Sequence, residues 1–579
     1  MHGVFGTYHT HISYSFDALQ TNLMHREMNM PNCHLWHYTL PKFENDKVFV
    51  NTDECIFIIE GVILNDRELL EQYHHTSLVS LIPHLYQSLG ETFFRVFRGS
   101  FCGVVYDIKQ DLLLVYNDHI GDHLIFYAEA ENGFCFSSDL QVLSNALRQI
   151  KPLQYNKGFM YSLLTYGYSP LCETIYEGFS RIPAGKYLRI TSNAHQLLTF
   201  HRFKNLPNTL SEQENIERMD SLFRNAVQRV IDKNKQYHFC NYFPLSAGLD
   251  SRMTNCVAHQ LSHEPIHNVT YSQSEYYDEL IPKQLADYWG NKMHFRALDG
   301  GNYLDNLDET VALTQGLVQY SGASQVLDSF ARLPKEQIGV VMTGMLGDII
   351  FGTAFTELNY NQSYALGCGA YSQYHIDRLK KYIPSDFWKE YPNREIYYLY
   401  VRGCYCANLG SPLILQSLGE SYSPFYDVDV LEFALSIPLK WRWNYHIYDK
   451  WILDKYPDMA QWKHNGTYTI GKRPKQVSLC GRSMEIKDIP KRLIWYVLKK
   501  MHIHDYYKEQ VGASMNPEDF WFENNPYLQN FANTYFAENM PLLSSDSLLD
   551  ADVRDLIHKN ASQKMQSLTL LATLKHFPC

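Results

Sequence analysis

Up to about residue 205, short apolar runs alternate with polar turns along the chain. The run CIFIIEGVIL at 55–64 is interrupted by Gly61, and similar runs fill 97–118 and 123–139, with Asp-Ile-Lys-Gln-Asp and Glu-Asn-Gly as turn signals. Because few helix-like stretches separate these runs, they predict antiparallel strands in two sheets that pack as a sandwich.

Beyond residue 205 the pattern changes. Apolar residues recur at helical spacing from 210 to 232, and then strand-like and helix-like stretches alternate: FCNYFPL, DSRMTNCVAHQL, IHNVTYS, DELIPKQLADYWG and IGVVMTG. This alternation predicts parallel βαβ units, and after about residue 360 the pattern is mostly helical. A chain of 579 residues also exceeds what one hydrophobic core usually organises. We therefore expect two domains, 1–205 and 206–579, of α/β plus α+β class.

The composition narrows the class of protein. With 45% hydrophobic and 20% charged residues and a net charge of −11, the chain is typical of a globular protein and is not expected to bind nucleic acid. The sequence has no apolar run of about 18 residues, and its start lacks the features of a signal peptide, so we expect a cytoplasmic protein without a membrane partner. Among twelve cysteines only Cys404 and Cys406 are close in sequence, which favours reduced thiols over a disulfide scaffold or zinc site.

One segment carries candidate chemistry, YFPLSAGLDSR at 242–252. An apolar strand ends at Leu245, small residues form a tight turn, and a helix begins near Asp250. Small side chains let a ligand approach the backbone, and the first amides of the helix favour an anion. Ser246 and Ser251 add hydroxyl donors, and Asp250 has the chemistry to hold Mg²⁺ against phosphate oxygens. An ordinary strand–turn–helix connection is the alternative.

Ser-Ala-Gly-Leu-Asp-Ser at 246–251 resembles the pyrophosphate-binding loop of the N-type ATP pyrophosphatases, and specifically that of the asparagine synthetase family, S-G-G-L-D-S. Four further segments resemble that family in the same order. They are Asp278 at the start of a helix that ends in Trp289-Gly290, TGMLGDIIFG at 343–352, SPFYD at 423–427, and DKWIL at 449–453.

The resemblance implies an adenine nucleotide α-hydrolase-like (PP-loop) domain that uses ATP and Mg²⁺. A substrate carboxylate would attack the α-phosphate, pyrophosphate would leave, and an amine would then displace AMP. The implied metal ligands are Asp250 and Asp348, and the implied catalytic residues are Lys450, Asp348 and Asp250. The implied nucleotide-binding residues are Leu245, Ser246, Ala247, Gly248, Leu249, Asp250, Ser251, Val269, Thr343 and Gly344. Two positions depart from the family: Met345 replaces its usual glutamate, and Ile349 replaces an acid.

The first domain resembles the family's class II glutamine amidotransferase domain, which has an Ntn-hydrolase fold. The resemblance rests on IEGVILN at 59–65, RGSFCGVVYD at 98–107, NDHIG at 117–121 and RIPAGKY at 181–187. However, His2 stands where the family has its nucleophilic cysteine, and Glu60 stands where an asparagine shapes the oxyanion hole. His25-Arg26 keeps a pair typical of the family, and nothing around Cys33 supports it as a substitute nucleophile. We expect no glutaminase activity and a structural or substrate-gating role.

The leading interpretation is an ATP-dependent amide-forming ligase that joins a small-molecule or peptide carboxylate to an amine or ammonia. β-Lactam synthetases and lasso-peptide cyclases are family members that also lack the cysteine, and other members amidate sugar acids. An asparagine synthetase fed by ammonia stays open, as does a homodimer. The alternative is a pseudoenzyme or nucleotide-binding protein of the same fold, which Met345 and Ile349 favour.

Overall fold

The structure is a computed structural model of the whole chain. It describes residues 2–10, 12, 23–131, 133–192, 194–355, 358–361, 364–404, 408–466, 469–472, 476–479, 482–485, 490 and 514–579.

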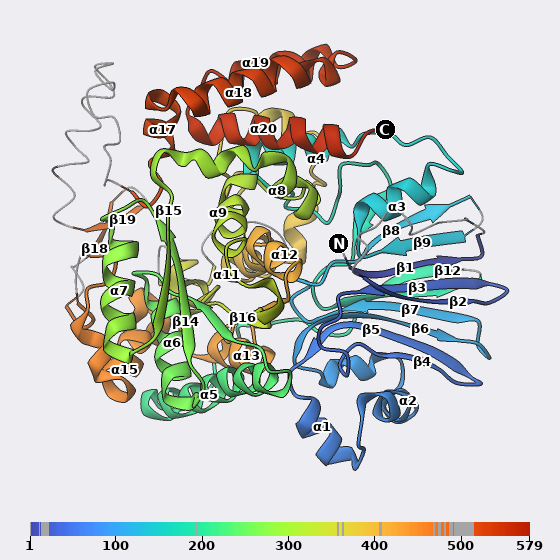
Figure 1. Cartoon of the computed structure of the whole chain (residues 1–579), viewed down its shortest axis with the longest axis horizontal. Helices are drawn as coiled ribbons and strands as arrows, with labels where there is room; N and C mark the ends of the chain where they lie inside the picture. Colours follow the sequence, from blue (N-terminus) through green and yellow to red (C-terminus); the bar gives the residue numbers. More distant parts are fainter. Residues whose placement is uncertain are drawn as a thin grey trace.

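Two six-stranded antiparallel sheets form the N-terminal domain, on the right of Figure 1. The first sheet has the order β10 (Phe179–Arg181), β8 (Phe126–Ala130), β9 (Gly133–Ser137), β1 (Gly3–Tyr8), β3 (Cys33–Thr39) and β2 (Met24–Asn29). The second has the order β12 (Ala194–Thr199), β11 (Lys186–Thr191), β7 (Leu112–Asn117), β6 (Gly99–Asp107), β5 (Cys55–Ile63) and β4 (Phe49–Asn51). The predicted antiparallel sandwich is confirmed.

The two sheets bury alternate side chains of their central strands against each other. Ile56 and Ile58 of β5 and Val104 of β6 lie in the layer between the sheets, whereas Phe57 and Ile59 face a second apolar layer that includes residues of α1 (Asp66–Tyr73) and α2 (Leu78–Leu89). Both faces of β5 are therefore covered, which explains why successive residues from Cys55 to Ile59 are apolar. Gly61 has a φ of 101°, and a Cβ there would lie 2.3 Å from the Ser100 carbonyl oxygen, so this position requires glycine.

A parallel sheet forms the centre of the second domain. One part has the order β13 (Asn241–Pro244), β14 (Ile266–Ser272) and β15 (Lys292–Ala297), and the other pairs β16 (Val340–Met342) with β17 (Glu420–Tyr422). A parallel bridge between Cys240 and Ile338 joins the two parts beside β13. The predicted βαβ arrangement is confirmed.

Helices fill most of the remaining chain, and several of those beyond residue 205 pack against this sheet. The earlier ones are α3 (Leu140–Leu147), α4 (Lys157–Tyr166), α5 (Glu212–Gln236), α6 (Leu249–Leu261), α7 (Tyr277–Trp289), α8 (Leu307–Leu313), α9 (Tyr320–Phe330), α10 (Ile376–Leu379) and α11 (Arg394–Tyr397). The later ones are α12 (Gly410–Gln416), α13 (Val428–Ser436), α14 (Leu439–Arg442), α15 (His446–Lys455), α17 (Glu518–Asn524), α18 (Pro526–Asn539), α19 (Ser547–Leu556) and α20 (Ala561–His576). A short antiparallel hairpin, β18 (Gln476–Leu479) and β19 (Arg482–Glu485), interrupts the helical region.

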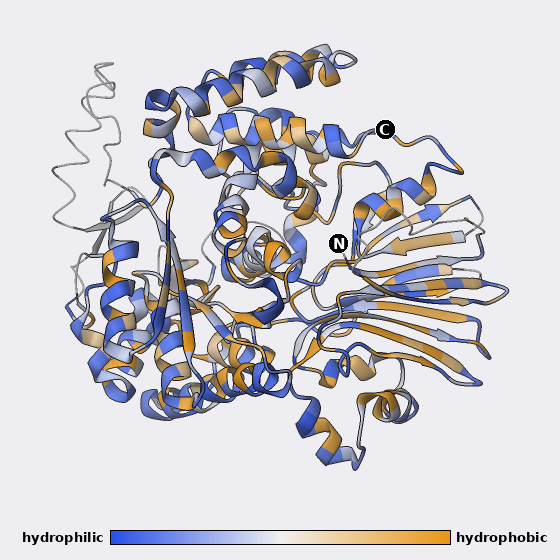
Figure 2. Ribbon diagram, viewed as in Figure 1, coloured by the Kyte–Doolittle hydropathy of each residue, from blue (hydrophilic) through white to orange (hydrophobic). Residues whose placement is uncertain are grey.

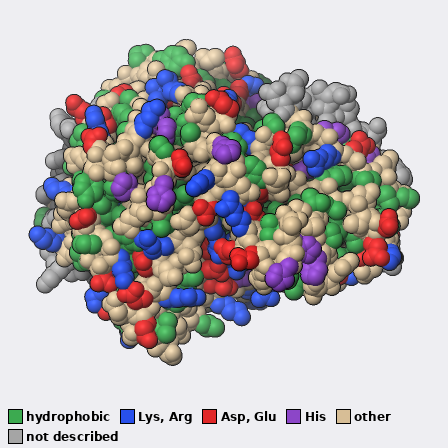
Figure 3. Space-filling view, turned by 60° about the horizontal axis from the view of Figure 1, so that its bottom comes forward, with side chains coloured by type: hydrophobic (Ala, Val, Ile, Leu, Met, Phe, Trp, Pro, Cys, Tyr) green, Lys and Arg blue, Asp and Glu red, His purple; other side chains and the backbone are tan. Residues whose placement is uncertain are grey.

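The end of the chain returns to the first domain. Helix α20 packs against α4 and α8, and the Gln566 side-chain amide donates to the Thr165 carbonyl oxygen at 3.3 Å. Figure 2 shows apolar residues concentrated along the strands of the sandwich, while the helices at the periphery carry many polar ones. On the face seen in Figure 3, acidic and basic side chains intermingle.

The cysteines with described positions are free thiols. Cys406 lies outside the described residues, so the Cys404–Cys406 pair is not tested. Within the described ranges, the structure contains no helix of the length and apolarity needed to cross a bilayer, and no group of three or more metal-ligating side chains.

Candidate functional site

The turn between β13 and α6 is built by its own small side chains. The Ser251 hydroxyl accepts from the Ser246 amide at 3.0 Å, and the two serine hydroxyl oxygens lie 2.9 Å apart. The Ser246 hydroxyl also accepts from the amide of Gly248, which is the N-cap of α6. Because glycine has no side chain to cap the helix, no N-cap side chain competes with a ligand for the first amides of α6.

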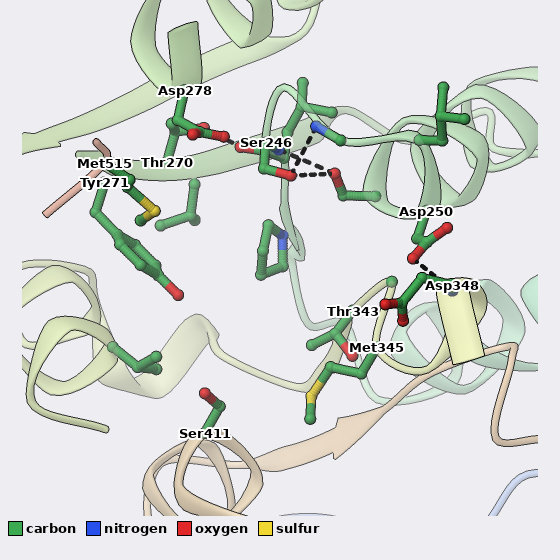
Figure 4. A pocket seen from close by; sticks show the side chains of 18 of the residues that line it. Ser246, Asp250, Thr270, Tyr271, Asp278, Thr343, Met345, Asp348, Ser411 and Met515 are labelled. Atoms are coloured by element: carbon green, nitrogen blue, oxygen red, sulfur yellow. Dashed lines mark hydrogen bonds between the residues drawn. The ribbon is translucent and has the colours of Figure 1, made fainter. Parts of the chain in front are cut away.

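A cavity of about 500 Å³ opens over this turn (Figure 4). The turn and α6 form one wall, Val269, Thr270 and Tyr271 of β14 form another, and the loop after β16 closes a third side. Asp278, at the start of α7, points toward the turn and accepts from the Ala247 amide at 2.8 Å. Burial raises the pKa of Asp278, and that hydrogen bond opposes the increase.

Two of the three aspartates that line the cavity are directly linked. One Asp250 carboxylate oxygen accepts from the Asp348 amide at 2.9 Å, and the other accepts from the Tyr448 hydroxyl at 2.9 Å. Gly344 permits this approach, because a Cβ there would lie 2.4 Å from the Ser251 amide nitrogen. Carboxylate oxygens keep further lone pairs after accepting one hydrogen bond, so Asp250 and Asp348 fit the ligand chemistry of Mg²⁺.

Most residues predicted from the sequence lie together at this cavity. Its lining includes Leu245, Ser246, Gly248, Leu249, Asp250, Ser251, Val269, Thr343, Gly344 and Asp348. Ala247 does not line the cavity: it is fully buried, and its backbone binds Asp278 and Arg252.

Lys450 is placed elsewhere. Its ammonium lies 2.5 Å from a carboxylate oxygen of Glu212 on α5, and its side chain is 48% exposed. It is not among the described residues that line the cavity. Tyr448, two positions earlier on α15, is the residue that faces Asp250. Residues two apart on a helix do not share a face, so Lys450 points away from the side of α15 that meets Asp250.

Several lining residues were not found from the sequence. They are Pro244, Thr270, Tyr271, Val326, Phe330, Ser411, Leu415, Tyr445, His464, Asn465 and Met515. They come from segments far apart in sequence, and each residue type is common in ordinary cores and surfaces. A helical apolar stripe in 320–330 predicts a buried face for Val326 and Phe330, but does not indicate that this face meets a ligand.

Met345 lies in the loop that the resemblance associates with catalysis. Its side chain points into the cavity on the side of Ser411 (Figure 4), and its carbonyl oxygen accepts from the Ser423 hydroxyl at 2.8 Å. Met345 and Ile349 are both partly buried against the hydrophobic core. The two departures from the family are thus accommodated by apolar packing.

In the N-terminal domain, the two unusual residues bind each other. His2 Nδ1 lies 2.8 Å from Glu60, which also contacts His37 Nε2 at 2.7 Å, the Thr39 hydroxyl at 2.9 Å and the Lys47 ammonium at 3.1 Å. Burial alone would raise the pKa of Glu60, but Lys47 and the hydrogen bonds from His2 and His37 hold it well below its ordinary value. An ionised carboxylate therefore occupies the place expected for an oxyanion hole.

Cys33 and the His25-Arg26 pair lie in different environments. Cys33 is buried, and burial raises the pKa of its thiol well above the ordinary value, which disfavours the thiolate. His25 and Arg26 lie on β2 and are exposed.

An antiparallel sandwich joined to a parallel α/β domain, with a serine- and glycine-lined turn beneath two linked aspartates, defines an amidotransferase-type domain coupled to a pyrophosphatase-loop domain. Family models agree: a glutamine amidotransferase domain matches residues 45–203, and asparagine synthase matches residues 218–389. The chain belongs to the asparagine synthetase family.

Its relatives are distant. A Methanocaldococcus jannaschii protein whose name is that of an asparagine synthetase (glutamine-hydrolyzing) is 23% identical over 55% of this chain and 63% of its own length. Asparagine synthetase (glutamine-hydrolyzing) 2 of Oryza sativa subsp. japonica is 22% identical over 73% of this chain and 66% of its own length. The chain thus spans a little under two-thirds of the length of these two relatives. A solved structure of an allosteric regulatory enzyme of purine biosynthesis is 10% identical, covers 42% of this chain and 52% of its own, and has a TM-score of 0.23, too low to support an argument.

Proposed function

We propose that the protein is an ATP-dependent ligase that activates a carboxylate as an acyl-adenylate, releases pyrophosphate and transfers the acyl group to an amine or ammonia. The observation that supports this most directly is the turn at 246–251, whose amides and hydroxyls share one cavity with the linked Asp250 and Asp348. Amides at a helix start favour a departing anion.

Each group has a role in this proposal. The first amides of α6 and the serine hydroxyls bind pyrophosphate, while Val269, Thr343 and Gly344 contact the nucleoside. Asp250 and Asp348 hold Mg²⁺, which supplies charge neutralisation to the phosphates when bound. Tyr448 orients the Asp250 carboxylate through its hydroxyl. The family resemblance implies that Lys450 stabilises the transition state. Because Lys450 pairs with Glu212, we assign this role to the groups that line the cavity.

The nitrogen source in this proposal is not glutamine. His2 and Glu60 occupy the positions where the family has a nucleophile and an oxyanion hole, and both are engaged with each other. Incubation with glutamine is expected to yield no glutamate above a protein-free control. Glutamate formed at a rate that depends on the protein would contradict this part of the proposal.

A nucleotide-binding protein without ligase chemistry is the second candidate, and Met345 is the observation that favours it, because an apolar side chain cannot move a proton. The two candidates differ in one assay. With Mg-ATP and a panel of carboxylates and amines, the ligase releases pyrophosphate and AMP in equal amounts, and Asp250→Asn abolishes this release. Nucleotide binding without pyrophosphate from any acid would support the second candidate instead.

A further inference from the structure

Three side chains of the N-terminal domain reach one short segment of the second domain. His2 Nε2 donates to the Gln416 carbonyl oxygen at 2.7 Å, and the Lys42 ammonium donates to the Leu418 carbonyl oxygen at 2.7 Å. His123 Nε2 lies 3.0 Å from a carboxylate oxygen of Glu420. The contacted residues fall within 416–420, between the end of α12 and the start of β17.

The contact between His123 and Glu420 is buried, and the contacts of His2 and Lys42 are partly buried. Glu420 has no exposed surface, and the side chains of His2 and His123 are 6% and 7% exposed. Burial would lower the pKa of His123, but Glu420 and the thiol of Cys102 raise it well above its ordinary value. Buried polar pairs of this kind depend strongly on geometry, since each partner loses its hydration and must find a replacement.

The contacted segment is continuous with residues that line the cavity. We call residues 410–423 the floor segment. It runs from the start of α12 through residues 417–419 and β17 to Ser423. Ser411 and Leu415 of α12 line the cavity. The Tyr422 carbonyl oxygen accepts from the Thr343 amide at 2.8 Å, and the Ser423 hydroxyl donates to the Met345 carbonyl oxygen at 2.8 Å. Thr343 and Met345 both line the cavity (Figure 4).

From this continuous chain of contacts we infer that the N-terminal domain is a positioning scaffold for the nucleotide cavity. His2, Lys42 and His123 hold the floor segment, and the floor segment fixes Thr343, Met345 and Ser411. Glu60 contributes by binding His2 Nδ1, which fixes the ring that reaches Gln416. The inference rests on the proposed function only in assuming that this cavity binds nucleotide.

The test uses the full chain and three variants. His2→Ala and His123→Ala each remove contacts to the floor segment. His9→Ala is the matched control, because His9 also pairs with a carboxylate, Asp111 at 3.1 Å, but both partners belong to the N-terminal domain. Hydrogen exchange of the ligand-free proteins is measured for peptides that cover 410–423 and 241–261. We expect exchange of the floor segment to be about tenfold faster in the two test variants, with 241–261 unchanged.

Binding supplies the second readout. The Kd for α,β-methylene-ATP with Mg²⁺ is expected to rise about fivefold in His2→Ala and His123→Ala and to stay at the wild-type value in His9→Ala. Exchange that matches the control, that rises equally along the whole chain, or that rises in the floor segment without a change in Kd would overturn the inference. If the wild-type protein does not bind the nucleotide, the proposed function fails, while the exchange data still decide whether the scaffold exists.

Discussion

Gly344 sets how closely the loop after β16 approaches the first turn of α6. A Cβ there would lie 2.4 Å from the Ser251 amide nitrogen and 2.6 Å from the Asp250 carbonyl carbon, and neither backbone atom can move without displacing the turn. We expect Gly344→Ala to weaken binding of Mg-ATP by about tenfold or more, since one ångström of misplacement is costly in such sites. Isothermal titration calorimetry measures this, and Gly322→Ala is the control because a Cβ at Gly322 meets nothing within 4 Å. Equal affinities for the two variants would contradict the steric argument.

Glu60 is a single residue with a pH-dependent effect on stability. Its pKa is held well below the ordinary value for a glutamate, so the carboxylate stabilises the fold at neutral pH and loses its contribution as the pH falls through the folded-state pKa. Glu60→Gln should lower the free energy of unfolding by about 3 kcal/mol at neutral pH, because it leaves buried cations without a counter-charge. Denaturant titrations at several pH values should show this difference shrinking toward acid. A difference that grows toward acid would contradict the ionised assignment.

At the scale of elements, α15 presents different residues on different faces. Tyr448 is fully buried and donates to Asp250, whereas Lys450 is half-exposed and pairs with Glu212. Tyr448→Phe should lower the rate of pyrophosphate release about tenfold, because it removes one hydrogen bond to a charged group. Lys450→Ala should change the rate by less than about twofold, because exposed ion pairs contribute little. Loss of activity in Lys450→Ala with full activity in Tyr448→Phe would reverse these roles and restore the assignment that the family resemblance implies.

At the scale of the whole molecule, the two domains share buried charges. The Lys233 ammonium of α5 lies 2.8 Å from Asp46 and 2.9 Å from Asp66, both in the N-terminal domain, and its side chain is 1% exposed. We expect one cooperative unfolding transition, and Lys233→Ala should lower the free energy of unfolding by about 3–5 kcal/mol because it leaves two buried carboxylates unpaired. Lys235→Ala, on the exposed side of the same helix, should change it by less than about 0.5 kcal/mol. Calorimetric scans in which Lys233→Ala unfolds like Lys235→Ala would contradict this.

Sequence patterns predicted the two sheets and the turn at 246–251 because alternation and small-residue turns are local signals. They did not reveal the cavity wall that includes His464 and Met515, since tertiary packing alone brings those residues to the turn. The sequence leaves the direction of Lys450 open for a related reason: a lysine on a helix carries no local signal of which side it faces. The sequence predicts that His2 and Glu60 remove glutaminase chemistry, and only the structure shows that the two residues bind each other.

In the proposed reaction, a carboxylate oxygen attacks the α-phosphate of ATP. The most direct test uses whichever carboxylate supports pyrophosphate release, isotopically labelled in its oxygens, with Mg-ATP and an amine. Mass spectrometry of the AMP is expected to show one labelled oxygen per molecule, and Asp250→Asn should form no AMP. AMP or ADP without the label, with the amide still formed, would exclude attack by the carboxylate on the α-phosphate.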